Sequence, residues 1–271
     1  MLWKQETCSI IYTEDKTVTR KINSTIDYIC QTKEIHCQLA IESGSRAWGF
    51  LSQDSDFDVR LIYCHNSDYY LSIFEQKDTF EFIDNQLFDV PFDIGGWDIK
   101  KALNLMYKSN AVIFEWLNSP IIYQSNDKLI KNLHEIQNDY FNPKAVFYHY
   151  QGMARNANSA LDLTQPIKLK KWFYLLRALL ACNWVMQKQC MPPVSITPMF
   201  DLLKPPIAKE IQELIILKAN QDESYTHTLS ARLQQFIYDL YNSISPDNLS
   251  DRPKSSIEPL NQIFKQAIYD H

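Results

Sequence analysis

The stretch that begins at Gly44-Ser45 and ends in an Asp-x-Asp pair constrains the fold of this chain more than any other feature. Residues 37–43 alternate apolar and polar side chains ahead of it, and residues 57–63 are mostly apolar, so both segments are predicted to be strands. Ten residues separate the serine from the first aspartate, which leaves room for a short helix near 46–51 and a turn. The sequence therefore predicts two strands that are joined by a glycine-containing connection.

The two aspartates of this stretch have the spacing of a metal site. Side chains alternate along a strand, so Asp56 and Asp58 are expected on the same face, where their charges repel each other. A divalent cation relieves that repulsion, and Mg²⁺ prefers carboxylate and water oxygens while it keeps positions open for phosphate oxygens. Gly44 lets the backbone approach a phosphate closely, and the Ser45 hydroxyl and nearby amides can bind it. The spacing thus indicates metal-dependent nucleotidyl transfer.

Several short blocks of sequence belong together with this stretch. They read Gly44-Ser45-Arg46-Ala47-x-Gly49, Ser55-Asp56-x-Asp58, Gly96-Trp97-Asp98-Ile99-Lys100-Lys101-Ala102-Leu103, Lys108-Ser109-Asn110, Glu115-Trp116-Leu117-Asn118-Ser119-Pro120 and Lys170-Lys171-Trp172-Phe173-Tyr174-Leu175-Leu176-Arg177. The first two blocks resemble the signature of the DNA polymerase β-like nucleotidyltransferase superfamily. Together, over roughly residues 20–205, the blocks resemble the predicted nucleotidyltransferases associated with RNA repair.

The pattern of elements changes along the chain at about residue 125. Before it, helical spacing of apolar residues over 17–34 is followed by the strand patterns, and after it only helical patterns remain. We therefore expect an α/β (α+β) nucleotidyltransferase domain with a small mixed sheet over residues 1–125, with helices mainly on one side. An all-helical domain over 126–271 should close the active-site cleft. Its helices are expected over 126–138, 144–162, 167–189, 207–219, 226–243 and 256–269.

The resemblance implies a third carboxylate, on a strand beside the first two. Residues 78–94 read as a hairpin that turns near Asp84-Asn85, and three aspartates in or after it compete for the role. Asp89 precedes a strand that contains a proline, whereas Asp93 lies well inside that strand and fits best. Asp98 is the alternative, and it has a simpler interpretation as the residue that caps the following helix.

One helix of the second half carries cations beside an apolar stripe. Within 167–189, the residues Lys170, Tyr174 and Arg177 recur at i, i+4 and i+7, so the two cations and the ring could bind a triphosphate and stack on a base. The alternative is an ordinary solvated face of an amphipathic helix. Glu115, in an earlier helix, is either an exposed charge or half of a structural ion pair.

We therefore expect transfer of a nucleoside monophosphate from an NTP to an acceptor hydroxyl with release of pyrophosphate. Mg²⁺, with Mn²⁺ as a substitute, is the expected cofactor. An RNA or tRNA end is the acceptor that the resemblance implies. The alternatives are a nucleotidyltransferase that acts on a protein or small molecule, and a non-catalytic nucleotide- or RNA-binding module. The expected catalytic and metal-binding residues are Asp56, Asp58 and Asp93, with Asp98 as the alternative third carboxylate, and the expected nucleotide-binding residues are Gly44, Ser45, Arg46, Lys170, Tyr174 and Arg177.

Composition limits which partners, metals and cellular location are expected for this chain. The net charge of −5 argues against a generic RNA-binding surface, so a short or structured RNA end fits better than a long tract. The six cysteines are scattered without a Cys-x-x-Cys pair, which is typical of reduced thiols in a cytoplasmic protein and argues against zinc. The N-terminus does not read as a signal peptide, and no apolar run approaches the length of a membrane span. The sequence does not predict the oligomeric state.

Overall fold

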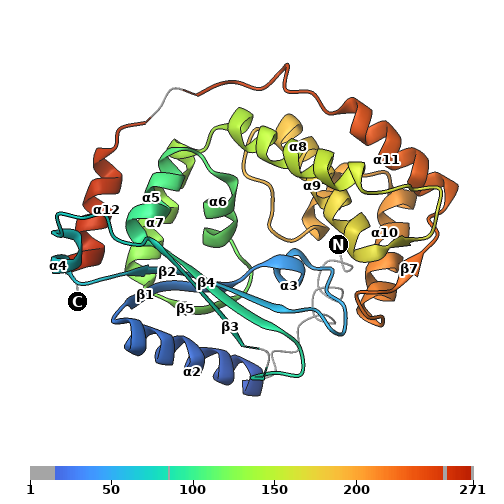
Figure 1. Ribbon diagram of the computed structural model, residues 1–271. Coiled ribbons are helices and arrows are strands. Elements are labelled where there is room, and N and C mark those ends of the chain that lie inside the picture. Colours follow the sequence, from blue (N-terminus) through green and yellow to red (C-terminus); the bar gives the residue numbers. More distant parts are fainter. Residues whose placement is uncertain (1–15, 85, 253–254, 270–271) are drawn as a thin grey trace.

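A five-stranded sheet is the centre of the protein, which is described here from a computed structural model over residues 16–84, 86–252 and 255–269 (Figure 1). The strands lie in the order β3-β4-β2-β1-β5. The pair β2–β4 is parallel and the other three pairs are antiparallel, so the sheet is mixed, as predicted. The bounds are β1 His36–Glu42, β2 Phe57–Cys64, β3 Thr79–Asp84, β4 Phe92–Asp98 and β5 Ile122–Ser125.

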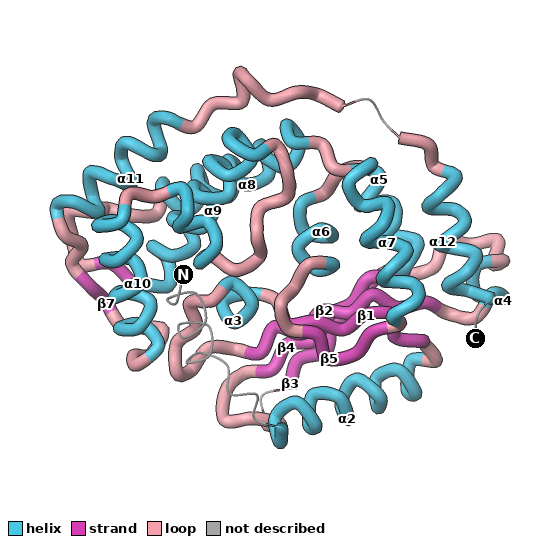
Figure 2. The backbone as a smooth tube through the Cα atoms, turned by 180° about the vertical axis from the view of Figure 1, so that it is seen from behind, coloured by secondary structure: helices cyan, strands magenta, loops and turns pink. Residues whose placement is uncertain are grey.

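Among the described residues, one helix covers one face of the sheet: α2 (Lys16–Lys33), which lies across it in both backbone views (Figures 1 and 2). Its apolar residues Ile22, Ile26 and Ile29 are buried because they recur at helical spacing on the side that faces the strands. They pack into one core with sheet residues that include Val59 and Leu61. The helix predicted over 17–34 is therefore confirmed.

The opposite face of the sheet carries several helices from both halves of the chain (Figures 1 and 2). The last of them, α12, returns to the first half, where the Phe264 ring meets Tyr70 edge-on at 5.0 Å between centroids. The Cys64 thiol also donates to the Ala267 carbonyl at 3.3 Å. A domain boundary at residue 125 stays a prediction. The bounds are α5 Ile99–Tyr107, α6 Ala111–Leu117, α7 Asp127–Tyr140 and α12 Glu258–Tyr269.

The remaining helices form a bundle beyond the end of the sheet, with α8 and α9 packed together at its centre. A short antiparallel pair, β6–β7, interrupts this helical region, so helices begin at Leu169 and Ala231 rather than at the predicted 167 and 226. Strands of two residues are too short to give a periodic pattern. The bounds are α8 Pro143–Ser159, β6 Ile167–Lys168, α9 Leu169–Lys188, η1 Thr197–Leu202, α10 Pro205–Ala219, β7 Thr226–His227 and α11 Ala231–Ser243.

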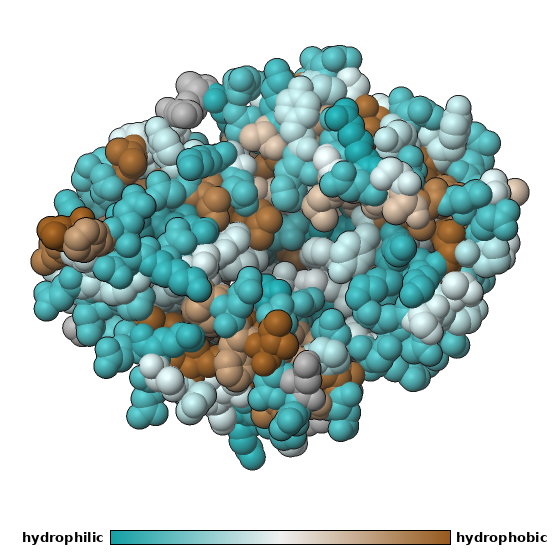
Figure 3. All heavy atoms as spheres, in the orientation of Figure 1, coloured by the Kyte–Doolittle hydropathy of each residue, from teal (hydrophilic) through white to brown (hydrophobic). Residues whose placement is uncertain are grey.

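The surface seen in Figure 3 is mainly hydrophilic, with hydrophobic side chains in small separate groups. One of these groups lies at the edge occupied by α4 (Ser67–Tyr70) and the chain that follows it, where Leu71, Ile73 and Phe74 are exposed. Within the described ranges, none of the helices is both long and apolar enough to span a membrane.

Candidate active site

The Gly-Ser turn places backbone, hydroxyl and carboxylate within contact of one another. Gly44 has a φ of +61°, a conformation that L side chains rarely adopt, and it opens the short helix α3 (Gly44–Trp48). A Cβ at Gly44 would lie 2.0 Å from Asp58 Oδ2, so only glycine leaves room for that carboxylate. Gly49, with a φ of 85°, ends the helix, which explains why it lies slightly earlier than the predicted 46–51.

The register between β2 and β4 decides which carboxylates meet. Because the two strands are parallel, Asp58 is the direct partner of Asp93, and Tyr63 is the partner of Asp98. Asp56 lies two residues before Asp58, immediately before β2 begins. Asp98 lies five positions further along β4, roughly 16 Å away at about 3.3 Å per residue. The structure therefore brings Asp93, and not Asp98, beside Asp58.

Asp98 has the structural role that its sequence context suggested. Its carboxylate caps α5 by accepting a hydrogen bond from the Lys100 amide at 2.8 Å, and the Tyr70 hydroxyl donates to it at 2.7 Å. The side chain is buried, and burial raises its pKa, although these two hydrogen bonds act in the opposite direction. Asp98 thus stabilises the start of a helix and lies away from Asp58 and Asp93.

An arginine that sequence reasoning overlooked lies between the two paired carboxylates. Arg60 Nη2 is 2.7 Å from Asp93 Oδ2 and 3.5 Å from Asp58 Oδ1, and Nη1 donates to the Val59 carbonyl at 2.9 Å. The signal was present in the sequence, because Arg60 follows Asp58 by two positions and therefore shares its face of the strand. Asp58 and Arg60 thus share one face of β2, and Asp56 directly precedes that strand.

The pKa values of Asp56 and Asp58 are both raised above the usual value of an aspartate. Burial raises the pKa of Asp58, and the charges of Asp93 and Asp56 raise it further while Arg60 lowers it. Burial also raises the pKa of Asp56, followed by the charge of Glu223, with Lys170 opposing. A bound cation would favour the charged form of both groups.

The donor set fits a hard divalent cation in part. Carboxylate oxygens are the ligands that Mg²⁺ prefers, and Asp56 and Asp58 supply them from one strand. Across the described parts of the chain, no three His, Cys, Asp or Glu side chains are already gathered as a metal cage. Asp93 Oδ2 is 2.7 Å from Arg60 Nη2, so a cation bound through this oxygen would have to displace the arginine.

A buried glutamate supports the backbone of the motif strand. Glu42, at the end of β1, accepts a hydrogen bond from the Asp58 amide at 2.9 Å and another from the Tyr123 hydroxyl at 2.7 Å. Burial raises the pKa of the Glu42 carboxyl to about 7, although the two hydrogen bonds and the charge of Arg46 lower it. Sequence reasoning missed this residue because a single glutamate at a strand end gives no signal of its contacts.

The predicted residues Lys170 and Tyr174 on α9 face the same region. Lys170 Nζ forms an ion pair with Glu223, on the connection between α10 and β7, and this carboxylate raises the pKa of Lys170 although burial lowers it. The Tyr174 ring meets the Trp48 ring edge-on, with 5.1 Å between the ring centroids, and burial raises the pKa of the Tyr174 hydroxyl. Both side chains are close enough to Asp56 to interact with its charge.

Arg46 and Ser45 are engaged with the loop that leads to the aspartates. Arg46 donates from Nε to the Asp56 carbonyl at 3.0 Å and from Nη2 to the Ser55 carbonyl at 2.8 Å, and its guanidinium lies 3.8 Å from the Phe57 ring centroid. Ser45 Oγ donates to Ser55 Oγ at 3.2 Å. These contacts position the loop. Ser45 would have to exchange its partner to donate to a phosphate, whereas Arg46 keeps further N–H donors on Nη1.

Arg177 does not lie at the surface of the site, contrary to its predicted role on the triphosphate. It is 1% exposed, its Nη2 pairs with Glu115 Oε1 at 2.9 Å, and its guanidinium lies 4.4 Å from the Trp48 ring centroid. The reason is that α9 is buried on nearly all sides, so a cation at i+7 turns into the interior instead of toward solvent. Of the two interpretations of Glu115, the structural ion pair is confirmed.

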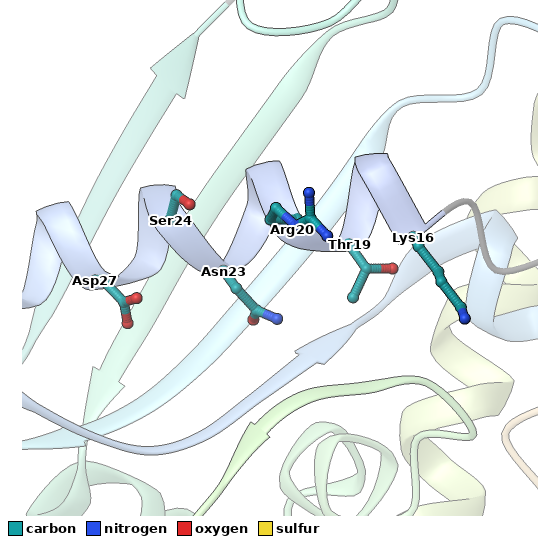
Figure 4. A pocket seen from close by; sticks show the side chains of 6 residues that line it. All are labelled: Lys16, Thr19, Arg20, Asn23, Ser24 and Asp27. Atoms are coloured by element: carbon teal, nitrogen blue, oxygen red, sulfur yellow. The ribbon is translucent and has the colours of Figure 1, made fainter.

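A pocket of about 430 Å³ lies elsewhere, along α2 on the other side of the sheet (Figure 4). It contains none of the candidate residues, and its lining side chains come from one helix. They are Lys16, Thr19, Arg20, Asn23, Ser24 and Asp27.

Comparisons with known proteins identify the family of this chain. The profile of RlaP, the RNA repair pathway DNA polymerase beta family, matches residues 18–266. The uncharacterized protein YcgL of Bacillus subtilis (strain 168) is 36% identical over 220 residues, which cover 80% of this chain and 83% of that protein. A solved nucleotidyltransferase-like protein from Exiguobacterium sibiricum 255-15 superposes with a TM-score of 0.33 at 11% identity, over 93% of this chain and 77% of that one.

The family match identifies the chain as a DNA polymerase β-like nucleotidyltransferase. Within that class, the chain belongs to the RNA repair pathway DNA polymerase beta family.

The buried ion pair between Arg177 and Glu115 predicts that loss of either charge has a large effect on stability. Arg177→Met should lower the free energy of unfolding by roughly 3–5 kcal/mol, because it leaves Glu115 buried without its partner. The double variant Arg177→Met/Glu115→Gln should recover part of that loss. Urea denaturation measures both, and a single variant within about 0.5 kcal/mol of the wild type, as surface substitutions usually are, would contradict the buried pair.

The raised pKa of Glu42 predicts a pH dependence of stability. Between its usual value of 4.5 and about 7, the folded chain holds a proton that the unfolded chain has lost. The free energy of unfolding should therefore fall as the pH rises through this window. Glu42→Gln cannot ionise at this position. Its free energy of unfolding, relative to that of the wild type, should therefore rise by on the order of 1–3 kcal/mol from about pH 5 to pH 8. Denaturation curves at several pH values test this, and a difference that does not change with pH would contradict it.

Proposed function

We propose that the protein transfers a nucleoside monophosphate from an NTP to an acceptor hydroxyl, with Mg²⁺ or Mn²⁺ as cofactor. The observation that supports this most directly is the parallel register of β2 and β4, which sets Asp93 opposite Asp58, while Asp56 lies two residues before Asp58 and just ahead of β2. Two carboxylates on paired strand positions and a third just before the strand suit the binding of a metal-bound triphosphate. The family supports the NTP as substrate.

In the proposed reaction the acceptor oxygen attacks the α-phosphorus, a new P–O bond forms, and the bond to the bridging oxygen breaks so that pyrophosphate leaves. Asp93 accepts the hydroxyl proton, and Asp56 and Asp58 hold the metal-bound triphosphate. When bound, the divalent cation would neutralise the triphosphate and lower the pKa of the acceptor hydroxyl. Gly44 supplies the close backbone approach and Ser45 a hydroxyl for the phosphates.

The α9 residues complete the proposed nucleotide site. Lys170 neutralises the triphosphate after exchanging Glu223 for a phosphate, and Tyr174 presents an aromatic ring on the same helix face. Arg46 keeps the loop before Asp56 in place through its two backbone hydrogen bonds. Arg177 has only a supporting role, through its contact with the Trp48 ring that Tyr174 packs against.

The proposed acceptor is an RNA end, supported by the family description. A short or structured end, such as a tRNA 3′ terminus, fits a chain with a net charge of −5 better than a long tract does. Scattered cysteines support a cytoplasmic setting. Labelled NTPs offered with RNA ends, proteins and small molecules in parallel test the acceptor, and labelling only of a protein or small molecule would replace RNA as the acceptor.

Substitution of the aspartates tests the assignment of roles. Asp56→Ala and Asp58→Ala should each abolish transfer without loss of fold. Asp93→Asn should lower the chemical step by at least about 10²-fold while NTP binding persists. Asp98→Asn is the matched control, because it should cost about 1 kcal/mol of stability as a weakened cap and leave the rate nearly unchanged.

Single-turnover assays and melting curves measure the two effects. Normal transfer by Asp56→Ala or Asp58→Ala would contradict the metal assignment. An inactive but stable Asp98→Asn beside an active Asp93→Asn would contradict the proposed role of β4. A chain that binds NTP no better with Mg²⁺ than without it would favour a non-catalytic module.

A further inference from the structure

Arg60 lies between Asp58 and Asp93 and contacts one carboxylate oxygen of each. Its Nη2 is 2.7 Å from Asp93 Oδ2 and 3.5 Å from Asp58 Oδ1, so one nitrogen contacts both carboxylates. Asp56 has no hydrogen bond from Arg60 in the described structure. The guanidinium therefore neutralises one side of the acidic group and leaves the Asp56 side open.

The fold holds this arginine in place from several directions. Gly95 is its register partner on β4, and without a side chain there the arginine can cross over that strand. Arg60 Nη1 is 3.6 Å and Cδ 3.9 Å from where a Gly95 Cβ would be. Nη1 also donates to the Val59 carbonyl at 2.9 Å and to the Asp93 carbonyl at 3.4 Å. The side chain is 23% exposed, so solvent weakens the contact with Asp93 only in part.

We propose that Arg60 is a resident counter-ion that prevents Asp93 from binding a divalent cation until nucleotide is bound. This inference depends on the proposed function. A cation that binds Asp93 through Oδ2 must first displace a charge-assisted hydrogen bond, whereas one that uses Asp56 and Asp58 needs to disturb only the longer contact. Phosphate oxygens match the guanidinium as well as a carboxylate does, so a triphosphate offers Arg60 another partner and releases Asp93.

Calorimetric titration with Mn²⁺ in the absence of nucleotide tests this. Arg60→Gln should bind Mn²⁺ about tenfold more tightly than the wild type, or at one additional site, which is the scale of one lost charge-assisted hydrogen bond. The double variant Arg60→Gln/Asp93→Asn should lose that gain, because the released ligand is absent. Arg232→Gln is the matched control, since it removes the same charge from an exposed helix position and should bind Mn²⁺ as the wild type does.

Melting curves give a second readout that does not depend on transfer. Without metal, Arg60→Gln should melt below the wild type because Asp58 and Asp93 then repel each other, and Mn²⁺ should raise its melting temperature by more than it raises that of the wild type. Arg60→Lys keeps a charge and serves if the glutamine variant does not fold, with an expected Mn²⁺ affinity close to that of the wild type.

The outcomes separate this inference from the proposed function. An Arg60→Gln chain with the wild-type number and affinity of Mn²⁺ sites overturns the counter-ion role and leaves the proposed function intact, provided that the wild type binds Mn²⁺ together with NTP. A gain that persists in the Asp93→Asn background also overturns it. Failure of the wild type to bind Mn²⁺ even with NTP overturns both.

Discussion

The parallel pairing of β2 with β4 is the constraint on which the site depends. A shift by one residue would turn Asp93 to the other face of the sheet and remove it from Asp58. Apolar residues fix the register, because Val59 and Leu61 on β2 and Ile94 on β4 are buried under α2. The acidic residues occupy the alternate positions on the opposite side. The same packing that stabilises the sheet thus aligns the carboxylates.

Charges contributed by the chain itself balance this acidic region. Arg60 pairs with Asp93 and Lys170 with Glu223, so two of the cations near the aspartates each hold a carboxylate. Substrate binding on the proposed account is therefore an exchange of partners, in which phosphates replace carboxylates. Such an exchange favours a metal-bound triphosphate over the metal or the triphosphate alone. The phosphates bind the basic side chains, and the metal binds the carboxylates that those side chains have left.

Periodic apolar patterns explain what the sequence predicts well. The α2 helix and the strands at 36–42 and 57–64 follow from spacing that is local in the chain, whereas the choice of Asp93 came from the family resemblance. Contacts between distant residues are different, because no local pattern carries them. The Glu115–Arg177 pair joins positions 62 residues apart, and the burial of that arginine depends on helices packing around α9. Arg60 was overlooked although strand alternation places it with the acids.

A crystal structure with Mg²⁺ and a non-hydrolysable NTP analogue tests the central claim most directly. The account predicts that the triphosphate lies against the Gly44-Ser45 turn, with Mg²⁺ bound by Asp56 and Asp58, and that Arg60 Nη2 has left Asp93. A nucleotide bound away from this turn, or a triphosphate bound with no metal near either aspartate, would contradict it.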